Sequence, residues 1–250
     1  MTETLWNAGC LLSGFALGIL GAAVFNRLPA GWLCDFGETP SEKLFGKRVS
    51  LKREGFVLGA VLAVSFVLFR FQYGTGSPVF PLTCLESVPL VLAALADAKY
   101  EILPDQFLLL LLPPAAANLI FDLANGKLFY GGAASPFLGA ACGAVLFLVL
   151  GLVGKLASGA EAIGFGDVKL TAALGFFCGF PRIFAVFLLA VFFAGIHFSI
   201  LILHKKIGRG SYRPLGPYLC AAFLFAAAFR AEIDLIAMRY WNLIQIGGGS

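Results

Sequence analysis

The stretch IFAVFLLAVFFAGIHFSILIL, residues 183–203, decides the fold class. It holds one histidine and no other ionisable side chain, and it is long enough to cross the hydrocarbon core of a bilayer, which takes about 20 apolar residues. Such runs recur along the chain, whose 250 residues are 60% hydrophobic and 13% charged, against about 25% charged residues in soluble domains. The composition therefore predicts an all-α, polytopic membrane protein and leaves almost no room for a separate soluble domain.

Eight membrane spans can be drawn from the apolar runs, of which the sixth is the shortest. We expect one membrane-embedded domain over residues 1–246, with a short cytoplasmic loop at about 27–53. The final four residues, GGGS at 247–250, are interpreted as a linker. The predicted bundle of about eight transmembrane helices has its spans at about 6–26, 54–72, 79–96, 103–121, 132–154, 167–181, 183–203 and 214–231.

The basic residues gather in short clusters between the spans. The two most basic connections, residues 27–53 and 204–213, are predicted to face the cytoplasm by the positive-inside rule. Eight alternating spans then place both termini outside and bring the acid-bearing connections 96–105 and 154–167 to the cytoplasmic side. This distribution suits membrane topology better than nucleic-acid binding, so the expected partner is the lipid bilayer and no nucleic acid is expected.

The cysteine and serine patterns give no support for disulfides, a metal site or a nucleophilic serine. The six cysteines lie mostly inside apolar runs and form no C-x-x-C pair, so neither a disulfide framework nor a metal site is predicted. The serines lack a G-x-S-x-G or Ser/Lys context, which gives nucleophilic catalysis no support.

Two aspartates stand at the predicted cytoplasmic ends of spans. Asp97 directly follows the apolar run 88–96, and Asp167 precedes the run VKLTAAL. If helix packing brings the two carboxyl groups together, they can share one proton. One acid then activates water while the other protonates the carbonyl or the leaving amine, which is the chemistry of an aspartic protease.

The glycines around Asp167 fit this chemistry, although the residues alone leave alternatives open. Gly164 and Gly166 would let the backbone approach an extended peptide closely. An aspartate at a helix start is also commonly an N-cap or a partner of the helix dipole, and Asp97 would then be a solvated helix-end acid that offsets Lys99.

Four motifs resemble those of the type IV prepilin peptidases, the G-x-G-D aspartic intramembrane proteases. Residues 97–105, DAKYEILPD, resemble the family's D-x-x-x-x-x-[IL]-P-D segment, and residues 164–167, GFGD, match its G-x-G-D motif. Residues 18–29, GILGAAVFNRLP, resemble the exit of the first span, although the spacing of the asparagine differs. Residues 213–219, RPLGPYL, resemble the entry to the last span. The motifs occur in the family's order and cover nearly the whole chain.

The resemblance implies a bi-aspartyl endopeptidase that removes the leader of prepilins or pseudopilins at the cytoplasmic face of the bacterial inner membrane. Asp97 and Asp167 would be the catalytic pair. Asp105 is expected to be a helix-start acid after Pro104, and Lys169 is expected to reach toward the inner membrane surface. The residues expected to support the motifs are Gly164, Gly166, Pro104, Asp105, Lys169, Gly216 and Pro217.

The family's cofactors concern a second activity. Many members also methylate the new N terminus of the pilin with S-adenosylmethionine, whereas proteolysis by two aspartates needs no cofactor. Larger members carry a tetracysteine zinc module in the first cytoplasmic loop, but this loop holds only Cys34. We therefore expect no zinc, and the methyltransferase step stays open.

Two other function classes use similar residues. A transporter or proton relay would use the acids as ion sites, but such acids usually lie near the membrane midplane in related halves. A presenilin-like protease shares G-x-G-D but places its acids deeper in the spans and carries a P-A-L segment, where this chain has Pro214-Leu215-Gly216. The spacing of residues 97–105 favours prepilin processing.

Overall fold

A computed structural model describes residues 2–34, 45–46, 48–125, 132–158, 164–205, 214–236 and 239. The proposed linker at 247–250 lies outside these ranges. The described residues are mostly helical and contain no strand, which confirms the predicted all-α class. The eight main helices are α1 (Thr2–Phe25), α2 (Phe56–Tyr73), α3 (Val79–Tyr100), α4 (Asp105–Ala124), α5 (Ser135–Ser158), α6 (Phe165–Cys178), α7 (Arg182–Leu203) and α8 (Gly216–Ala228).

Each main helix matches one predicted span, with ends shifted by a few residues. Six of the described helices are long and apolar enough to cross a membrane, whereas α6 and α8 are shorter. Short turns complete the described chain: 3-10 turns at Ala30–Trp32 and Gly132–Ala134, and a π-helical turn at Leu51–Gly55 that leads directly into α2. Residues 230–236 are helical again after α8.

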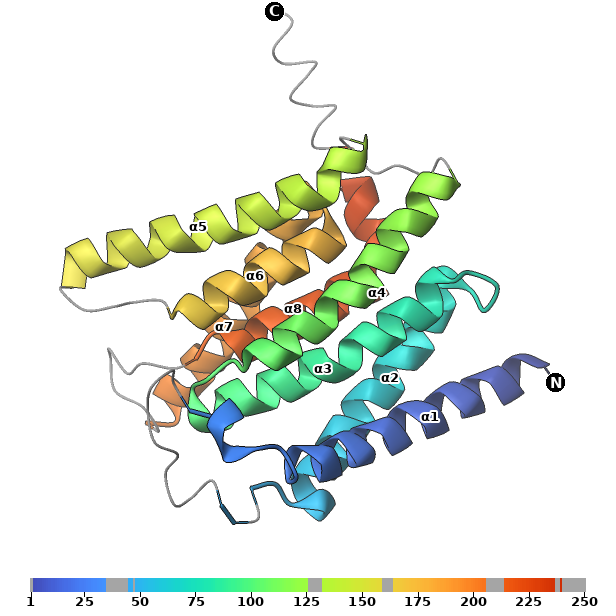
Figure 1. Cartoon of the computed structure of the whole chain (residues 1–250), viewed down its shortest axis with the longest axis horizontal. Coiled ribbons are helices and arrows are strands. Elements are labelled where there is room, and N and C mark those ends of the chain that lie inside the picture. The colour runs from blue at the N-terminus through green and yellow to red at the C-terminus, as the bar shows by residue number, and fades with distance from the viewer. Residues whose placement is uncertain are drawn as a thin grey trace, which may run out of the picture.

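The helices pack as neighbours along the chain and are then joined across it (Figure 1). The pairs α1–α2, α3–α4, α5–α6 and α7–α8 lie side by side, while α3 also packs on α8 and α4 packs on α6. The long helix α3 is the most buried of the six spans, whereas α5 and α7 turn most of their surface outward. The core therefore lies around α3, α6 and α8, and the other helices shield it from lipid.

Small residues set how closely α5 and α6 approach. An ideal Cβ placed on Gly139 would lie 2.2 Å from the carbonyl oxygen of Gly175, and one on Gly175 would lie 2.2 Å from that of Gly139. Because no real side chain tolerates such distances, only glycine fits at either position. This contact follows the small-residue spacing that brings helices together in lipid.

Chain direction gives the bundle two distinct ends. The end of α3 and the starts of α4, α6 and α8 lie together, and we call this the Asp97 end. The end of α2, the end of α6 and the start of α7 lie at the opposite end, which we call the Tyr73 end. Residues far apart in the sequence are thus brought to one end of the bundle.

The short helices create a step at the Asp97 end. Helix α6 has 14 residues and α7 has 22, which correspond to lengths of about 21 and 33 Å at a rise of 1.5 Å per residue. Residues 179–181 join the two helices tightly at the Tyr73 end, so α6 begins about 12 Å short of the level at which α7 finishes. Helix α8, with 13 residues, is similarly short.

One carboxyl group inside the bundle lies far from this end. Glu86 in α3 is completely buried, and neither of its carboxylate oxygens has a hydrogen-bond partner among the described residues. Glu86 stands three helical turns from Asp97, so along the axis of α3 it lies about 16 Å away. It therefore does not belong to the site at the Asp97 end.

Candidate active site

Asp97 lies in the last turn of α3 and faces the start of α8. Its side chain is buried, with 5% of its surface exposed. An ideal Cβ on Gly216, the first residue of α8, would lie 2.4 Å from Oδ2 of Asp97. Any side chain at position 216 would therefore displace the carboxylate, so glycine is required there on steric grounds.

The first turn of α8 also presents its backbone to Asp97. The N–H groups of Tyr218 and Leu219 both donate to the carbonyl oxygen of Leu215, and Pro217 has no N–H to offer. The N–H of Gly216 lies beside the Asp97 carboxylate. The positive end of a helix thus faces this acid and favours its ionised form.

Asp167 is the third residue of α6 and is also buried, with 7% of its surface exposed. The N-cap of α6 is Gly164, whose extended backbone accepts a bond of 3.1 Å from the Asp167 N–H, and α6 has no side-chain cap. The interpretation of Asp167 as an N-cap is therefore wrong, whereas its place in the first turn of α6 is one where a carboxylate interacts with the helix dipole. Its Oδ1 atom has no hydrogen-bond partner among the described residues.

The two aspartates converge although neither their helices nor their motifs are adjacent in sequence. They are close enough for their charges to interact, and both also interact with the buried Cys220, one turn beyond Gly216 in α8. Each keeps one buried carboxylate oxygen, Oδ2 of Asp97 and Oδ1 of Asp167, without a partner in the described part of the chain. Two buried acids with unpaired acceptor atoms among the described residues thus share one region at the Asp97 end.

A bidentate ion pair joins the starts of α4 and α6. The Nζ atom of Lys169 lies 2.8 Å from Oδ1 and 2.9 Å from Oδ2 of Asp105, and it stands 5.2 Å from the centre of the Phe165 ring. Asp105 begins α4 directly after its N-cap, Pro104, as expected for a helix-start acid. Lys169 is partly exposed, as expected, but the expectation missed its partner.

The two glycines of the G-x-G-D motif have different surroundings. An ideal Cβ on Gly166 would lie 3.1 Å from Cβ of Leu103, so the segment before α4 rests against this glycine. Nothing lies within 4 Å of the corresponding position at Gly164. Gly166 thus fixes the packing of two motif segments, whereas Gly164 has open space at its Cβ position.

Lys99, two residues beyond Asp97, points away from it. Its Nζ atom lies 2.9 Å from Oε1 of Glu54 and donates to the carbonyl oxygen of Arg48 at 2.8 Å. The alternative in which Asp97 is a solvated acid that offsets Lys99 is therefore wrong. The ion pair ties the last turn of α3 to the turn before α2.

Asn26 holds the same part of the first loop. Its side-chain nitrogen donates to the carbonyl oxygen of Val49 at 2.8 Å, and its Oδ1 accepts the backbone N–H groups of Arg48 at 2.9 Å and Val49 at 2.8 Å. This asparagine belongs to the N-terminal motif segment, but no pattern in the sequence indicated its partners. It fastens the end of α1 to residues 48–49, and the carbonyl oxygen of Arg48 in turn accepts from Lys99.

Metal ligands are not assembled in the described part of the chain. Among those residues, no three His, Cys, Asp or Glu side chains lie together in a way that could hold a metal ion. No disulfide joins the cysteines in the described part of the chain. The expectation that zinc is absent stays a prediction.

The fold and the site define a class: a multi-pass membrane protein with two buried, interacting aspartates at one end of its bundle. The model of the type IV leader peptidase family matches residues 84–199, a region that contains both aspartates. This region of the chain is therefore similar to the type IV leader peptidase family, in agreement with the resemblance seen in the motifs.

Individual relatives agree with the family assignment. A prepilin leader peptidase/N-methyltransferase of Xanthomonas campestris pv. campestris is 34% identical over 167 residues, which cover 66% of this chain and 54% of the relative. A protein of the same name from Bacillus subtilis is 29% identical over 192 residues, covering 76% of this chain and 71% of the relative. The chain thus spans about half of the Xanthomonas protein. No solved structure matches it.

Proposed function

We propose that the chain is an aspartic endopeptidase that cleaves the leader peptide of type IV prepilins or pseudopilins, with Asp97 and Asp167 as the catalytic pair. One observation carries the proposal: two buried carboxyl groups from distant motifs interact, and each retains an oxygen without a partner among the described residues. Buried acids without partners are costly to maintain, which favours a functional reason for keeping them.

The two acids divide the hydrolysis between them. The ionised carboxylate takes a proton from a water molecule as the water oxygen forms a bond to the carbonyl carbon, and the protonated acid donates its proton to the carbonyl oxygen. The resulting diol then loses its C–N bond as a proton is transferred to the leaving amine. We assign the base role to Asp97, because the start of α8 and the N–H of Gly216 face it and stabilise its charge.

The site is proposed to face the cytoplasm at the bacterial inner membrane. The two most basic connections are residues 27–53 and 204–213, and their described parts next to α1, α2 and α7, residues 27–34, 48–53 and 204–205, lie at the Asp97 end. Positive connections stay inside. A pilin-type substrate would keep its apolar helix in the bilayer and bring an extended segment into the step left by α6 and α8. Residues 1–246 are proposed to form a single domain.

Methylation is a separate question. The names of the relatives include an N-methyltransferase, a reaction that consumes S-adenosylmethionine as methyl donor. The residues that the structure describes offer no identified set of side chains for this molecule, so we derive no methylation step. The mass of the cleaved product shows whether the chain methylates it, because methylation replaces one hydrogen of the new N terminus with a methyl group.

Replacement of each aspartate tests the proteolytic assignment. In a purified prepilin cleavage assay in detergent, Asp97→Asn and Asp167→Asn should each abolish cleavage, because an amide can neither take a proton from water nor deliver one. The exposed Glu232, among the helical residues after α8, supplies the matched control, and Glu232→Gln should retain the wild-type rate. Thermal unfolding should show that all three variants are folded. Cleavage retained by either aspartate variant would falsify the assignment.

A further inference from the structure

The apolar run of α7, residues 183–203, carries one ionisable side chain, His197. Its imidazole is exposed, six residues before the helix ends at Leu203, or about 9 Å along the axis. A polar ring on the outer surface of an apolar span loses the hydrogen bonds that water would give it, so it needs a partner in the protein. The place of that partner in the fold therefore bears on the role of His197.

The partner of His197 is the tyrosine in the first turn of α8. Nδ1 of His197 and Oη of Tyr218 are 2.5 Å apart and share a hydrogen bond, and the two ring centres are 5.7 Å apart. Phe198 packs edge to face on the same tyrosine, with ring centres 5.6 Å apart. The hydrogen bond and the two ring contacts together fix the direction of the Tyr218 side chain against α7.

The first turn of α8 moves as one unit with this tyrosine. Its N-cap is Leu215, whose carbonyl oxygen accepts the N–H of Tyr218 at 3.0 Å, and Gly216 lies between them in the chain. Among the described residues, no side chain caps the start of this helix. A shift of Tyr218 would therefore carry Gly216 with it, and the bond to His197 ties this turn to α7.

Gly216 connects this turn to the catalytic pair. Its N–H lies beside the Asp97 carboxylate, and an ideal Cβ on it would lie only 2.4 Å from Oδ2 of that acid. Helices α3 and α7 both pack on α8, so Asp97 and His197 contact the same turn from two different helices. A displacement of the turn would therefore change the distance between the positive end of α8 and the acid to which we assign the base role.

We propose that His197 is a positioning residue of the protease. Through its bond to Tyr218 it holds the first turn of α8 at the distance from Asp97 at which the helix end stabilises the ionised carboxylate. It acts on the reaction through the tyrosine and the helix, without touching the reacting atoms. This inference rests on the proposed function, because it concerns the rate of the same hydrolysis.

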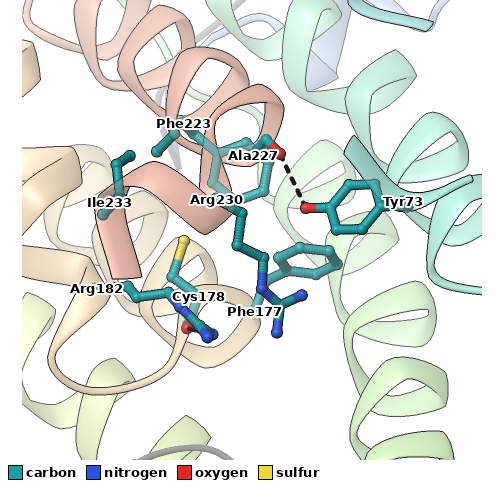
Figure 2. A pocket seen from close by; sticks show the side chains of 9 residues that line it. Tyr73, Phe177, Cys178, Arg182, Phe223, Ala227, Arg230 and Ile233 are labelled. Atoms are coloured by element: carbon teal, nitrogen blue, oxygen red, sulfur yellow. Dashed lines mark hydrogen bonds between the residues drawn. The ribbon is translucent and has the colours of Figure 1, made fainter. Parts of the chain in front are cut away.

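A second tyrosine bond to α8 supplies the matched control. At the Tyr73 end, the hydroxyl of Tyr73 in α2 donates to the carbonyl oxygen of Ala227 in the last turn of α8, at 3.0 Å (Figure 2). Ala227 lies 11 residues after Gly216, which is about 16 Å along the helix. Tyr73→Phe therefore removes the same chemical group from the same helix, but far from the catalytic pair.

Cleavage of a prepilin by the full chain in detergent tests the proposal. His197→Phe keeps a ring against Tyr218 but loses the nitrogen, and it should lower kcat about 10-fold with KM unchanged, because even a small displacement near the reacting groups slows catalysis this much. His197→Asn places a polar amide near the position of Nδ1 and should recover most of kcat. Tyr73→Phe should keep the wild-type kcat.

A double variant shows whether His197 acts through the tyrosine. Tyr218→Phe should lower kcat at least as much as His197→Phe, and the two changes together should cause no further loss than Tyr218→Phe alone. Thermal unfolding should show that these variants are folded, since His197→Phe only makes the span more apolar.

Three outcomes would overturn the inference. They are a wild-type kcat for His197→Phe, a further loss when it is combined with Tyr218→Phe, and equal losses in His197→Phe and Tyr73→Phe, which would indicate a general effect on α8. Failure of the proposed function looks different, because Asp97→Asn would then still cleave whatever residue occupies position 197.

Discussion

The ammonium group of Lys169 contacts both carboxylate oxygens of Asp105, at 2.8 and 2.9 Å, across 64 residues of sequence. One residue belongs to the D-x-x-x-x-x-L-P-D segment and the other lies just beyond G-x-G-D. The pair is partly exposed, so by itself it contributes less than about 1 kcal/mol to stability. Its importance lies in fixing the start of α6, and hence Asp167, relative to α4.

The first prediction concerns this ion pair. Lys169→Met should lower the rate of prepilin cleavage roughly 10- to 100-fold, because a small displacement of a catalytic group costs that much, while the unfolding temperature changes little. The charge-reversed double variant, Asp105→Lys with Lys169→Asp, should recover much of the rate. Lys52→Met, which removes an exposed lysine in the turn before α2, is the control. A double variant no better than the single one would contradict the positioning role.

The second prediction concerns the glycine beside Asp97. Gly216→Ala places a methyl group where the carboxylate oxygen lies, at 2.4 Å, and should reduce cleavage by on the order of 100-fold. Gly195→Ala in α7 is the matched control, since nothing lies within 4 Å of its Cβ position, and it should cleave at the wild-type rate. Full activity of Gly216→Ala would mean that the contact with Asp97 is not needed for catalysis.

The third prediction concerns the hydrogen bonds by which Asn26 holds residues 48–49 of the first loop. Asn26→Ala removes three hydrogen bonds to Arg48 and Val49 and should lower the free energy of unfolding by about 1–3 kcal/mol. Limited proteolysis should then cut the segment between α1 and α2 faster. Asn125→Ala, which loses only a bond to Phe121 in its own helix, should be nearly neutral in both measurements.

The fourth prediction concerns the buried acid of α3. Glu86→Met replaces a carboxyl group that has no partner among the described residues with an apolar side chain of similar size. The free energy of unfolding in detergent should rise by about 1–3 kcal/mol, because the cost of desolvating the carboxyl group disappears. Glu86→Gln should gain less, since an amide also needs partners. A lower unfolding temperature for Glu86→Met would reveal an interaction that stabilises the carboxyl group.

The fifth prediction concerns metals. Because two aspartates suffice for peptide hydrolysis and the first loop holds only Cys34, EDTA and phenanthroline should leave the cleavage rate unchanged. The same chelators applied to a zinc protease provide the positive control. A loss of activity that added zinc restores would show that a metal takes part.

Hydropathy was enough to predict the helices, because each span needs about 20 apolar residues whatever its neighbours are. It could not locate their ends. Helix α8, over Gly216–Ala228, is shorter than the predicted span 214–231, whereas α6, over Phe165–Cys178, begins two residues before its predicted start. The shortness of the sixth span was visible in hydropathy, but the roughly 12 Å step also depends on how α6 and α7 are joined, which hydropathy does not contain.

The motifs were likewise enough to identify the two aspartates, but not what surrounds them. The contacts of Gly216 with Asp97 and of Asp105 with Lys169 depend on α8 packing on α3 and on α4 packing on α6. Such contacts between distant segments leave no local pattern in one sequence. The same holds for Lys99, whose nearest acid in sequence is Asp97 but whose partner in the structure is Glu54.

The shortness of α6 sets how far a substrate must reach into the bundle. A peptide that enters from the level where α7 finishes must descend about 12 Å to meet the start of α6, and an extended chain covers that depth with about four residues. The depth at which α6 begins would then help to select the peptide bond that is cut, in addition to the side chains of the substrate. Lengthening α6 by one turn should move the cut, or prevent it, without altering a single catalytic atom.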